Sequence, residues 1–216
     1  MPQDLTALAL TLLFAMLAVM GASWVFQSVT RNTGWVDVFW TYGTGAVGVF
    51  AALSAGEPPR AWLVAAMIGL WALRLGTYIA IRVAGSKEED ARYVALKAKW
   101  GKGFHLRLLP FVLTQAPVSM LLALAVALAA ATSGPWGLRD AVAVALWLIA
   151  IVGESVADGQ MKRFKADPGN KGKVMDRGLW AWSRHPNYFF EWIVWWAYPV
   201  LALQPDQPVT WLSLAA

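Results

Sequence analysis

One short stretch, residues 182–192, gathers side chains that could do chemistry at the start of an otherwise apolar segment. Its functional groups are a guanidinium, an imidazole, a carboxamide, a phenol and a carboxylate, on Arg184, His185, Asn187, Tyr188 and Glu191. Pro186 suits the first turn of a helix, because its missing N–H removes a donor that has no partner there. The N-terminus of such a helix favours an anion such as phosphate. The spacing therefore predicts a helix beginning at Pro186, with an anion-binding polar face.

The same stretch also fits a structural role at a membrane surface. Arg184 and His185 would meet lipid headgroups, while Trp180, Trp182 and Tyr188 would form an aromatic belt. A carboxylate within a membrane helix costs free energy and usually has a function, so Glu191 favours a functional role. The spacing of these residues leaves both interpretations open.

The elements that must position these groups are long apolar blocks. The chain has 216 residues, of which 58% are hydrophobic and 14% charged, and its mean hydropathy is +0.50. A bilayer about 30 Å thick requires about 20 consecutive apolar residues in a spanning helix. We therefore expect an all-α, polytopic membrane helix bundle that forms a single integral membrane domain over residues 1–216. The expected spans are 5–26, 35–54, 61–81, 108–131, 138–156 and 186–203, with the start of a seventh at Val209.

The distribution of positive charge predicts the orientation of the bundle. Of the 18 Lys and Arg, 15 (Lys87 among them) follow the first, third and fifth spans, whereas Arg60 and Arg139 lie on the other side and Arg74 within a span. By the positive-inside rule, the N-terminus faces out and the polar segments 82–107 and 159–182 face the cytoplasm. We expect a bacterial inner membrane, or the endoplasmic reticulum in a eukaryote, with membrane lipids and no nucleic acid as partners.

Other features of the sequence argue against a soluble dinucleotide-binding domain, a thiolate site and a metal site. Gly43 to Gly48 fits the dinucleotide pattern GxGxxG, but it follows no strand, and small residues that allow close helix contact explain it better. The absence of cysteine excludes disulfides and thiolate sites. Only His105 and His185 are available to a metal, and they lie on different segments. A transporter stays possible, although no internal repeat is visible.

Polar residues outside the 182–192 stretch have both structural and functional interpretations. Each could be a salt bridge or hydrogen bond that fixes helix packing, and Asp37 could form a structural ion pair with Arg74. Those near the polar segments could instead meet a cofactor that enters from the cytoplasm. The set comprises Asp37, Tyr42, Arg74, Gln115, Glu154, Asp158, Asn187 and Glu191.

The run from Ser183 to Tyr188, followed by Glu191, resembles the signature of the steroid 5-alpha-reductase superfamily, in particular its bacterial membrane branch. The similarity extends from about Asp37 to Tyr198. Related Arg-His-Pro signatures occur in membrane isoprenylcysteine and phospholipid methyltransferases, which use S-adenosylmethionine, and Asn187 favours the reductase. The other similar motifs are Asp37-Val38-Phe39-Trp40, Leu73-Arg74-Leu75, Glu89-Asp90-x-Arg92-Tyr93, Glu154-xxx-Asp158-x-Gln160 and Gly178-Leu179-Trp180.

The resemblance implies an NADPH-dependent reduction of a carbon–carbon double bond conjugated to a ketone. The expected substrate is lipophilic, such as a 3-oxo-Δ4 steroid, and enters from the bilayer. A methyltransferase or a non-enzymatic lipid-binding or transport protein is the alternative. The resemblance also implies a last helix that continues beyond Ala216. The implied catalytic groups are Asp37, Tyr42 and Glu191, and the implied cofactor ligands are Arg82, Asp158, Lys165, Arg184, His185, Asn187 and Tyr188.

Overall fold

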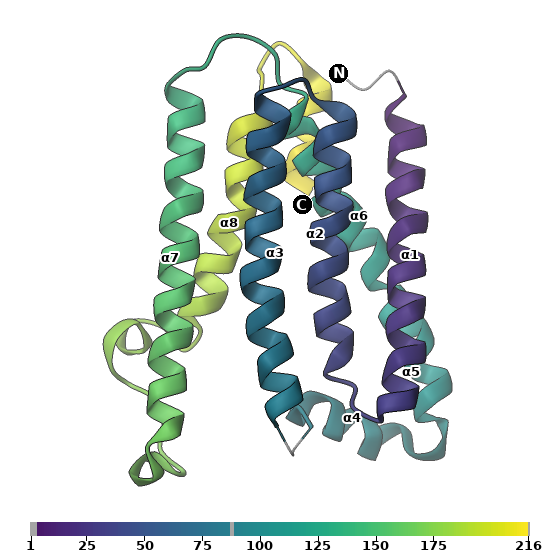
Figure 1. The fold of residues 1–216 in the computed structure, drawn as a ribbon, viewed down its shortest axis with the longest axis vertical. Coiled ribbons are helices and arrows are strands. Elements are labelled where there is room, and N and C mark those ends of the chain that lie inside the picture. Colours follow the sequence, from purple (N-terminus) through teal and green to yellow (C-terminus); the bar gives the residue numbers. More distant parts are fainter. Residues whose placement is uncertain (1–3, 87–88, 216) are drawn as a thin grey trace. The chain divides into compact units, whose positions relative to one another are not determined.

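A computed structural model describes residues 4–86 and 89–215 (Figure 1). Within these residues the regular structure is helical and contains no strand. Lys87, which entered the charge count, lies outside the described residues. The chain divides into two compact units: unit 1 comprises residues 1–133 and 202–216, and unit 2 comprises residues 134–201.

Unit 1 is built around α2, which packs against α1, α3 and α6. Asp4 begins α1 by accepting a hydrogen bond from the backbone N–H of Ala7 over 2.8 Å. In Figure 1, α1, α2 and α3 run side by side, and α4 runs crosswise at their lower ends. The elements of unit 1 are α1 (Leu5–Thr30), α2 (Trp35–Ala55), α3 (Arg60–Gly85), α4 (Ala91–Trp100), η1 (Gly101–Gly103), α5 (Phe104–Leu113), α6 (Gln115–Ala130) and η4 (Pro208–Ala215).

Unit 2 holds one long helix and one shorter helix joined by a polar connection. The beginning of α7 is fixed by Asp140, which accepts a hydrogen bond from the backbone N–H of Gly137 over 2.9 Å. The predicted start of the shorter helix at Pro186 is confirmed. The elements of unit 2 are α7 (Leu138–Ala166), η2 (Pro168–Asn170), η3 (Gly178–Ala181) and α8 (Pro186–Ala202).

The expected spans correspond to helices of the structure. Within residues 4–86 and 89–215, five segments are long and apolar enough to cross a membrane: α1, α2, α3, the run from α4 to α6, and α7. This is the composition of an integral membrane protein. The sixth expected span forms α8, whose 17 residues rise about 26 Å. Its crossing of the bilayer stays a prediction, as do the orientation of the chain and a seventh span, whose expected start lies in η4.

The fourth expected span is broken into two helices near Pro117, the second of its two prolines. α5 ends at Leu113 and α6 begins at Gln115, with Thr114 between them. Pro117 has no backbone N–H to donate to the carbonyl of Leu113, and its ring crowds that carbonyl. The break therefore falls one turn before Pro117.

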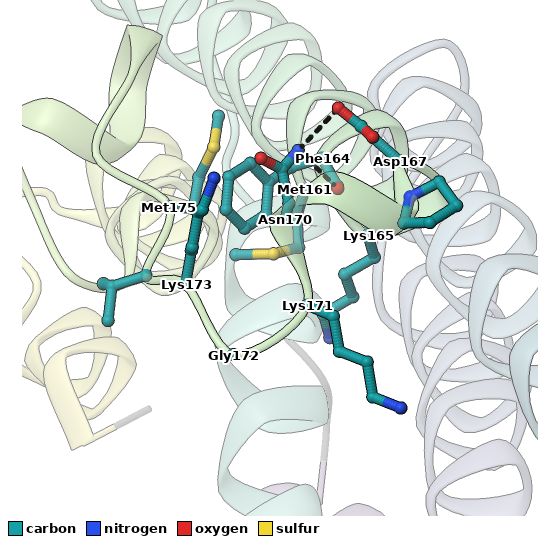
Figure 2. Close-up of a pocket in the computed structure, with 11 residues that line it drawn as sticks. Met161, Phe164, Lys165, Asp167, Asn170, Lys171, Gly172, Lys173 and Met175 are labelled. Atoms are coloured by element: carbon teal, nitrogen blue, oxygen red, sulfur yellow. Dashed lines mark hydrogen bonds between the residues drawn. The ribbon is translucent and has the colours of Figure 1, made fainter.

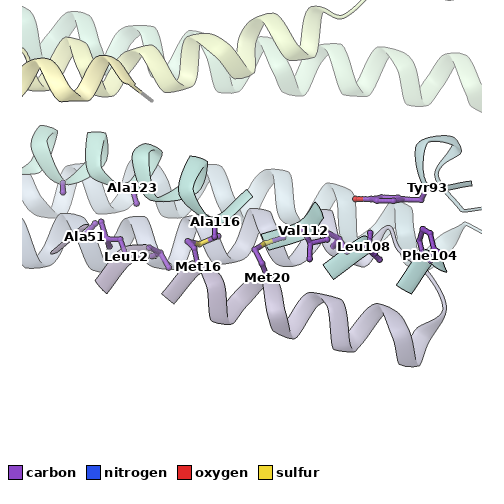
Figure 3. Packing of buried hydrophobic residues seen from close by; sticks show 13 residues of the cluster. Leu12, Met16, Met20, Ala51, Tyr93, Phe104, Leu108, Val112, Ala116 and Ala123 are labelled. Atoms are coloured by element: carbon purple, nitrogen blue, oxygen red, sulfur yellow. The ribbon is translucent and has the colours of Figure 1, made fainter. Parts of the chain in front are cut away.

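Apolar side chains from α1, α2, α5 and α6 form the core of unit 1 (Figure 3). Leu12, Met16 and Met20 lie on one face of α1 at helical spacing, and all three are fully buried. Opposite them, alanines on α6 allow the backbones to approach closely, as is common between membrane helices. Tyr93 of α4 belongs to the same cluster and brings a phenol into it.

The glycines of the GxGxxG pattern are confirmed as helix contacts. A Cβ added at Gly45 would collide with Ala72 of α3, and one at Gly48 would lie 2.7 Å from Ile68 of the same helix. A Cβ at Gly43 would collide with Val19 of α1. These positions are therefore small because α1 and α3 approach α2 there.

Gly45→Ala is therefore expected to lower the melting temperature of the protein in detergent by about 5 °C, since overpacking costs about 1–3 kcal/mol. Gly21→Ala is the matched control, because a Cβ at this other helix-interior glycine meets nothing within 4 Å. Equal melting temperatures for the two variants would contradict the close approach of α2 and α3.

Candidate functional site

An acid and a phenol meet at one end of unit 1. Asp37, in the first turn of α2, accepts from Nη2 of Arg92 over 2.7 Å and from the Tyr93 hydroxyl over 3.0 Å. The two donors reach different carboxylate oxygens, Oδ2 and Oδ1 respectively. Tyr93 is 4% exposed, whereas the Arg92 side chain is 61% exposed. Asp37 thus acts as a double acceptor that joins α2 to α4.

Asp90 fixes the position of Arg92 in this cluster. Its carboxylate begins α4 by accepting from the backbone N–H of Arg92 over 3.0 Å, and it also accepts from Nε of the same residue over 3.0 Å. These bonds hold the pKa of Asp90 below its usual value. Arg82, an expected cofactor ligand, approaches the other oxygen of Asp90 at 3.9 Å. Arg92 therefore bridges Asp37 and Asp90, and Arg82 lies beside them.

A second acid, Glu89, ties α4 to the loop between α1 and α2. One carboxylate oxygen accepts from the backbone N–H of Thr33 over 2.7 Å, and the other pairs with Nζ of Lys97 over 2.6 Å. Burial favours the neutral acid, but the bonds from Lys97 and Thr33 outweigh it and hold the pKa of Glu89 below its ordinary 4.5. The charged form of Glu89 is therefore part of the folded state.

The lowered pKa values of Glu89 and Asp90 predict acid sensitivity. Their folded pKa values lie below the unfolded ones, so their stabilisation is present above pH 4.5 and is lost as the pH falls through the folded values. We expect the melting temperature to fall below pH 4.5 and Glu89→Gln to reduce that fall by about 2 °C. Melting curves recorded between pH 7 and 3.5 measure this fall for both proteins. The same dependence of melting temperature on pH in Glu89→Gln as in the unchanged protein would contradict the prediction.

Tyr42, the phenol expected beside Asp37, bonds elsewhere. Its hydroxyl lies 2.8 Å from Oγ1 of Thr77 on α3. Its ring lies against Gly76, where an added Cβ would be 2.8 Å from the ring. The phenol that the structure brings to Asp37 is that of Tyr93, which belongs to the motif Glu89-Asp90-x-Arg92-Tyr93 but was not an expected catalytic residue.

In unit 2, α7 carries two buried acidic side chains in the half that is expected to lie towards the cytoplasm. Glu154 is 3% exposed and Asp158 is 6% exposed. The connection after α7 folds back onto this helix, because Nε1 of Trp180 donates to the carbonyl of Ala157 over 3.0 Å and the Leu179 backbone N–H donates to Gln160 over 3.0 Å. The motif residues Gln160, Leu179 and Trp180 therefore hold the connection against the last turns of α7.

α8 presents Asn187 and Glu191 four residues apart, on one face. The carboxamide oxygen of Asn187 is buried and accepts no hydrogen bond from any described residue. Glu191 accepts from Nε1 of Trp195 over 3.0 Å. α7 and α8 approach closely at Gly153, because a Cβ there would collide with the ring of Phe190. The Asn187 oxygen is one of several buried side-chain polar atoms without a hydrogen bond among the described residues, and such an acceptor can take a ligand or a water molecule.

The remaining expected residues of this stretch face outward. Arg184 and His185 are exposed, and Tyr188 is 64% exposed. The rings of His185 and Tyr188 stack with centroids 5.2 Å apart and 12° between their planes. Ser183 holds this turn by accepting from the backbone N–H of His185 over 3.1 Å. The stretch thus combines a stacked aromatic surface with a nearby cation.

The end of α7 and the connection after it line an open basic cavity of about 540 Å³ (Figure 2). Lys165, Lys171 and Lys173 contribute ammonium groups, and Asp167 is the acid among the lining residues. Asn170 shapes the loop by donating to the carbonyl of Phe164 over 3.0 Å. Phe164, Met161, Val174 and Met175 add apolar surface. Such a lining suits an anionic ligand with an apolar or flat portion.

Of the three lysines of this cavity, Lys165 was an expected cofactor ligand and the other two were not. Lys171 and Lys173 belong to the charge excess of segment 159–182 and carry no local motif. The turn around Pro168 and Gly169, which brings them back towards Lys165, was the available signal. Asp167 accepts from the backbone N–H of Gly169 over 2.8 Å and so closes this turn.

The chain matches other proteins over most of its length. Residues 23–216 match the family described as "Protein of unknown function (DUF1295)". An uncharacterized protein of Schizosaccharomyces pombe is 27% identical over 221 residues, which cover 89% of this chain and 64% of that protein, so the chain spans less than two thirds of that relative. No solved structure matches the chain significantly. Since the family match covers most of its residues, this chain belongs to the DUF1295 family.

Proposed function

We propose that this protein is a membrane reductase that uses NADPH to reduce the carbon–carbon double bond of a lipophilic enone, such as a 3-oxo-Δ4 steroid. The observation that carries the proposal is the buried, unsatisfied carboxamide oxygen of Asn187. It lies within the run that resembles the steroid 5-alpha-reductase signature. We place the protein in a bacterial inner membrane, with the substrate entering from the bilayer and the cofactor from the cytoplasm.

The residues of unit 2 fit the chemistry of NADPH. A carboxamide acceptor suits an amide N–H, as the nicotinamide offers. The lysines of the basic cavity suit phosphates, and the stacked rings of His185 and Tyr188 suit a flat ring. Asn187 and Asp158 would hold the nicotinamide end, and Lys165 and Arg184 would hold phosphates. Arg82 and Glu191 keep the cofactor-binding and catalytic roles that the resemblance implies.

The chain's own contribution to the reaction is to stabilise negative charge. NADPH supplies a hydride to the β-carbon of the enone. Charge then develops on the ketone oxygen, where a donor in a water-poor site stabilises the transition state more than the ground state. We assign this donor to the Tyr93 hydroxyl, whose acceptor in the structure is Asp37. A proton from solvent at the α-carbon completes the saturated ketone.

Ligand-dependent melting tests the proposal against the methyltransferase alternative. Purified protein in detergent should melt higher with NADPH, by an amount that grows with the ratio of its concentration to its dissociation constant. S-adenosylmethionine should leave the melting temperature unchanged. Consumption of NADPH, followed by its absorbance, should require an added enone steroid. Stabilisation by S-adenosylmethionine instead of NADPH would overturn the proposal, and stabilisation by neither would favour a lipid-binding or transport role.

A further inference from the structure

The lysines and arginines between Ala91 and Arg107 fall into two sets that differ in their partners. Arg92 and Lys97 are neutralised within unit 1, by Asp37 and Asp90 and by Glu89 respectively. Lys99, Lys102 and Arg107 are exposed and form no ion pair with any residue that the structure describes. From Ala91 to Arg139 the sequence contains no Asp or Glu. The second set is therefore an uncompensated positive surface, and we call it the basic corner.

The basic corner is held rigidly where α4 meets α5. Gly101 adopts a φ of +53°, which is unfavourable for other residues and lets the chain turn out of α4. Nε1 of Trp24 on α1 donates to the carbonyl of His105 over 2.9 Å, and Trp100 packs against Phe104 and Phe111. The three cations are therefore presented by a fixed turn.

The surroundings of the basic corner are apolar. Leu106, between Lys102 and Arg107, is 79% exposed, and Phe111 on the next turns of α5 is 41% exposed. α5 and α6 belong to a segment apolar enough to span a membrane, so this corner lies where a span meets the interface. Long basic side chains at such a position extend their charges to the headgroups while their stems stay in apolar surroundings.

We propose that the basic corner binds anionic phospholipid headgroups of the leaflet in which α4 lies. No acid among the described residues pairs with its cations, and its apolar neighbours fit acyl chains. Each basic residue near an anionic membrane surface adds to the attraction, and the attraction falls with ionic strength. This inference is independent of the proposed reductase activity, because it uses neither Asp37 nor any residue of unit 2.

Native mass spectrometry of the full chain tests this inference, with phosphatidylglycerol and phosphatidylcholine offered in equal amounts. The unchanged protein should retain phosphatidylglycerol preferentially. The triple variant Lys99→Gln, Lys102→Gln, Arg107→Gln should lower that preference by about tenfold or more. The charge-keeping variant Lys99→Arg, Lys102→Arg, Arg107→Lys should retain it. Circular dichroism checks that the helices of each variant are intact.

The matched control removes the same charge elsewhere, through Lys162→Gln, Arg163→Gln and Arg177→Gln, all exposed in unit 2. It should keep most of the preference. An equal loss in the control would mean that net charge alone attracts the lipid and would overturn the proposal. Full competition by soluble glycerol phosphate would also overturn it, since the surface would then bind phosphate and not a membrane lipid. A loss of the preference for phosphatidylglycerol in the charge-keeping variant would also overturn the proposal.

Discussion

Asp37→Asn is expected to lower turnover of an enone steroid by about 100-fold or more, with NADPH affinity within about twofold of the unchanged protein. The carboxylate accepts from both Arg92 and Tyr93, and a carboxamide offers one acceptor oxygen in place of two. One oxygen cannot accept from both donors as the carboxylate does, and the remaining NH2 group faces a donor, so the geometry that holds the Tyr93 hydroxyl is disturbed. Steady-state consumption of NADPH in detergent measures turnover, and ligand-dependent melting measures affinity. Unchanged turnover would remove Asp37 from the reaction.

Glu89→Gln is the control for a purely structural effect. Glu89 anchors the same helix through Lys97 and Thr33 but does not contact Tyr93 in the described hydrogen bonds. We expect this variant to lose stability while keeping turnover. If its turnover falls as far as that of Asp37→Asn, the cluster only positions α4.

Two phenol variants separate the sequence-based expectation from the structure-based one. Tyr93→Phe should reduce turnover almost as much as Asp37→Asn, because it removes the hydroxyl that lies 3.0 Å from Asp37. Tyr42→Phe should have little effect on turnover, since that hydroxyl bonds to Thr77. The reverse result would restore Tyr42 as the phenol and remove Tyr93.

Features that depend on neighbouring residues were predictable from the sequence. Pro186 begins α8 because a residue without an N–H fits the first turn of a helix wherever that helix lies. Pro117 interrupts the fourth span for an equally local reason. The small residues of the GxGxxG pattern also signalled close helix contact, although the partners Val19, Ile68 and Ala72 became known only from the fold.

The partners of the polar residues were not predictable. Tyr93 and Arg92 lie more than 50 positions from Asp37 in the sequence, and their meeting depends on α4 running crosswise at the ends of α1 to α3. Periodicity identifies the faces of a helix but not its direction in the fold. The same reason explains why Tyr42 was the expected phenol. It lies five residues from Asp37 in the sequence, but residues that are close in sequence need not be close in space.

Asn187→Ala is expected to weaken NADPH binding by about tenfold to 100-fold without lowering the melting temperature of the ligand-free protein. The two effects separate because the carboxamide oxygen is buried without a hydrogen bond from any described residue. Removing an unsatisfied buried acceptor costs no hydrogen bond between described residues, whereas it deprives a bound amide of its acceptor. Melting curves over a series of NADPH concentrations measure both quantities in one experiment.

The matched control is Asn32→Ala, because the Asn32 carboxamide accepts from the backbone N–H of Gly34 over 3.0 Å and has a structural role. We expect the opposite pattern there, with a lower melting temperature and unchanged NADPH affinity. Asp158→Ala should weaken NADPH binding as Asn187→Ala does, whereas Asp176→Ala, which replaces an exposed acid of unit 2, should not. If Asn187→Ala destabilises the protein and leaves NADPH affinity unchanged, its oxygen serves packing through a bound water molecule, and unit 2 loses its central cofactor ligand.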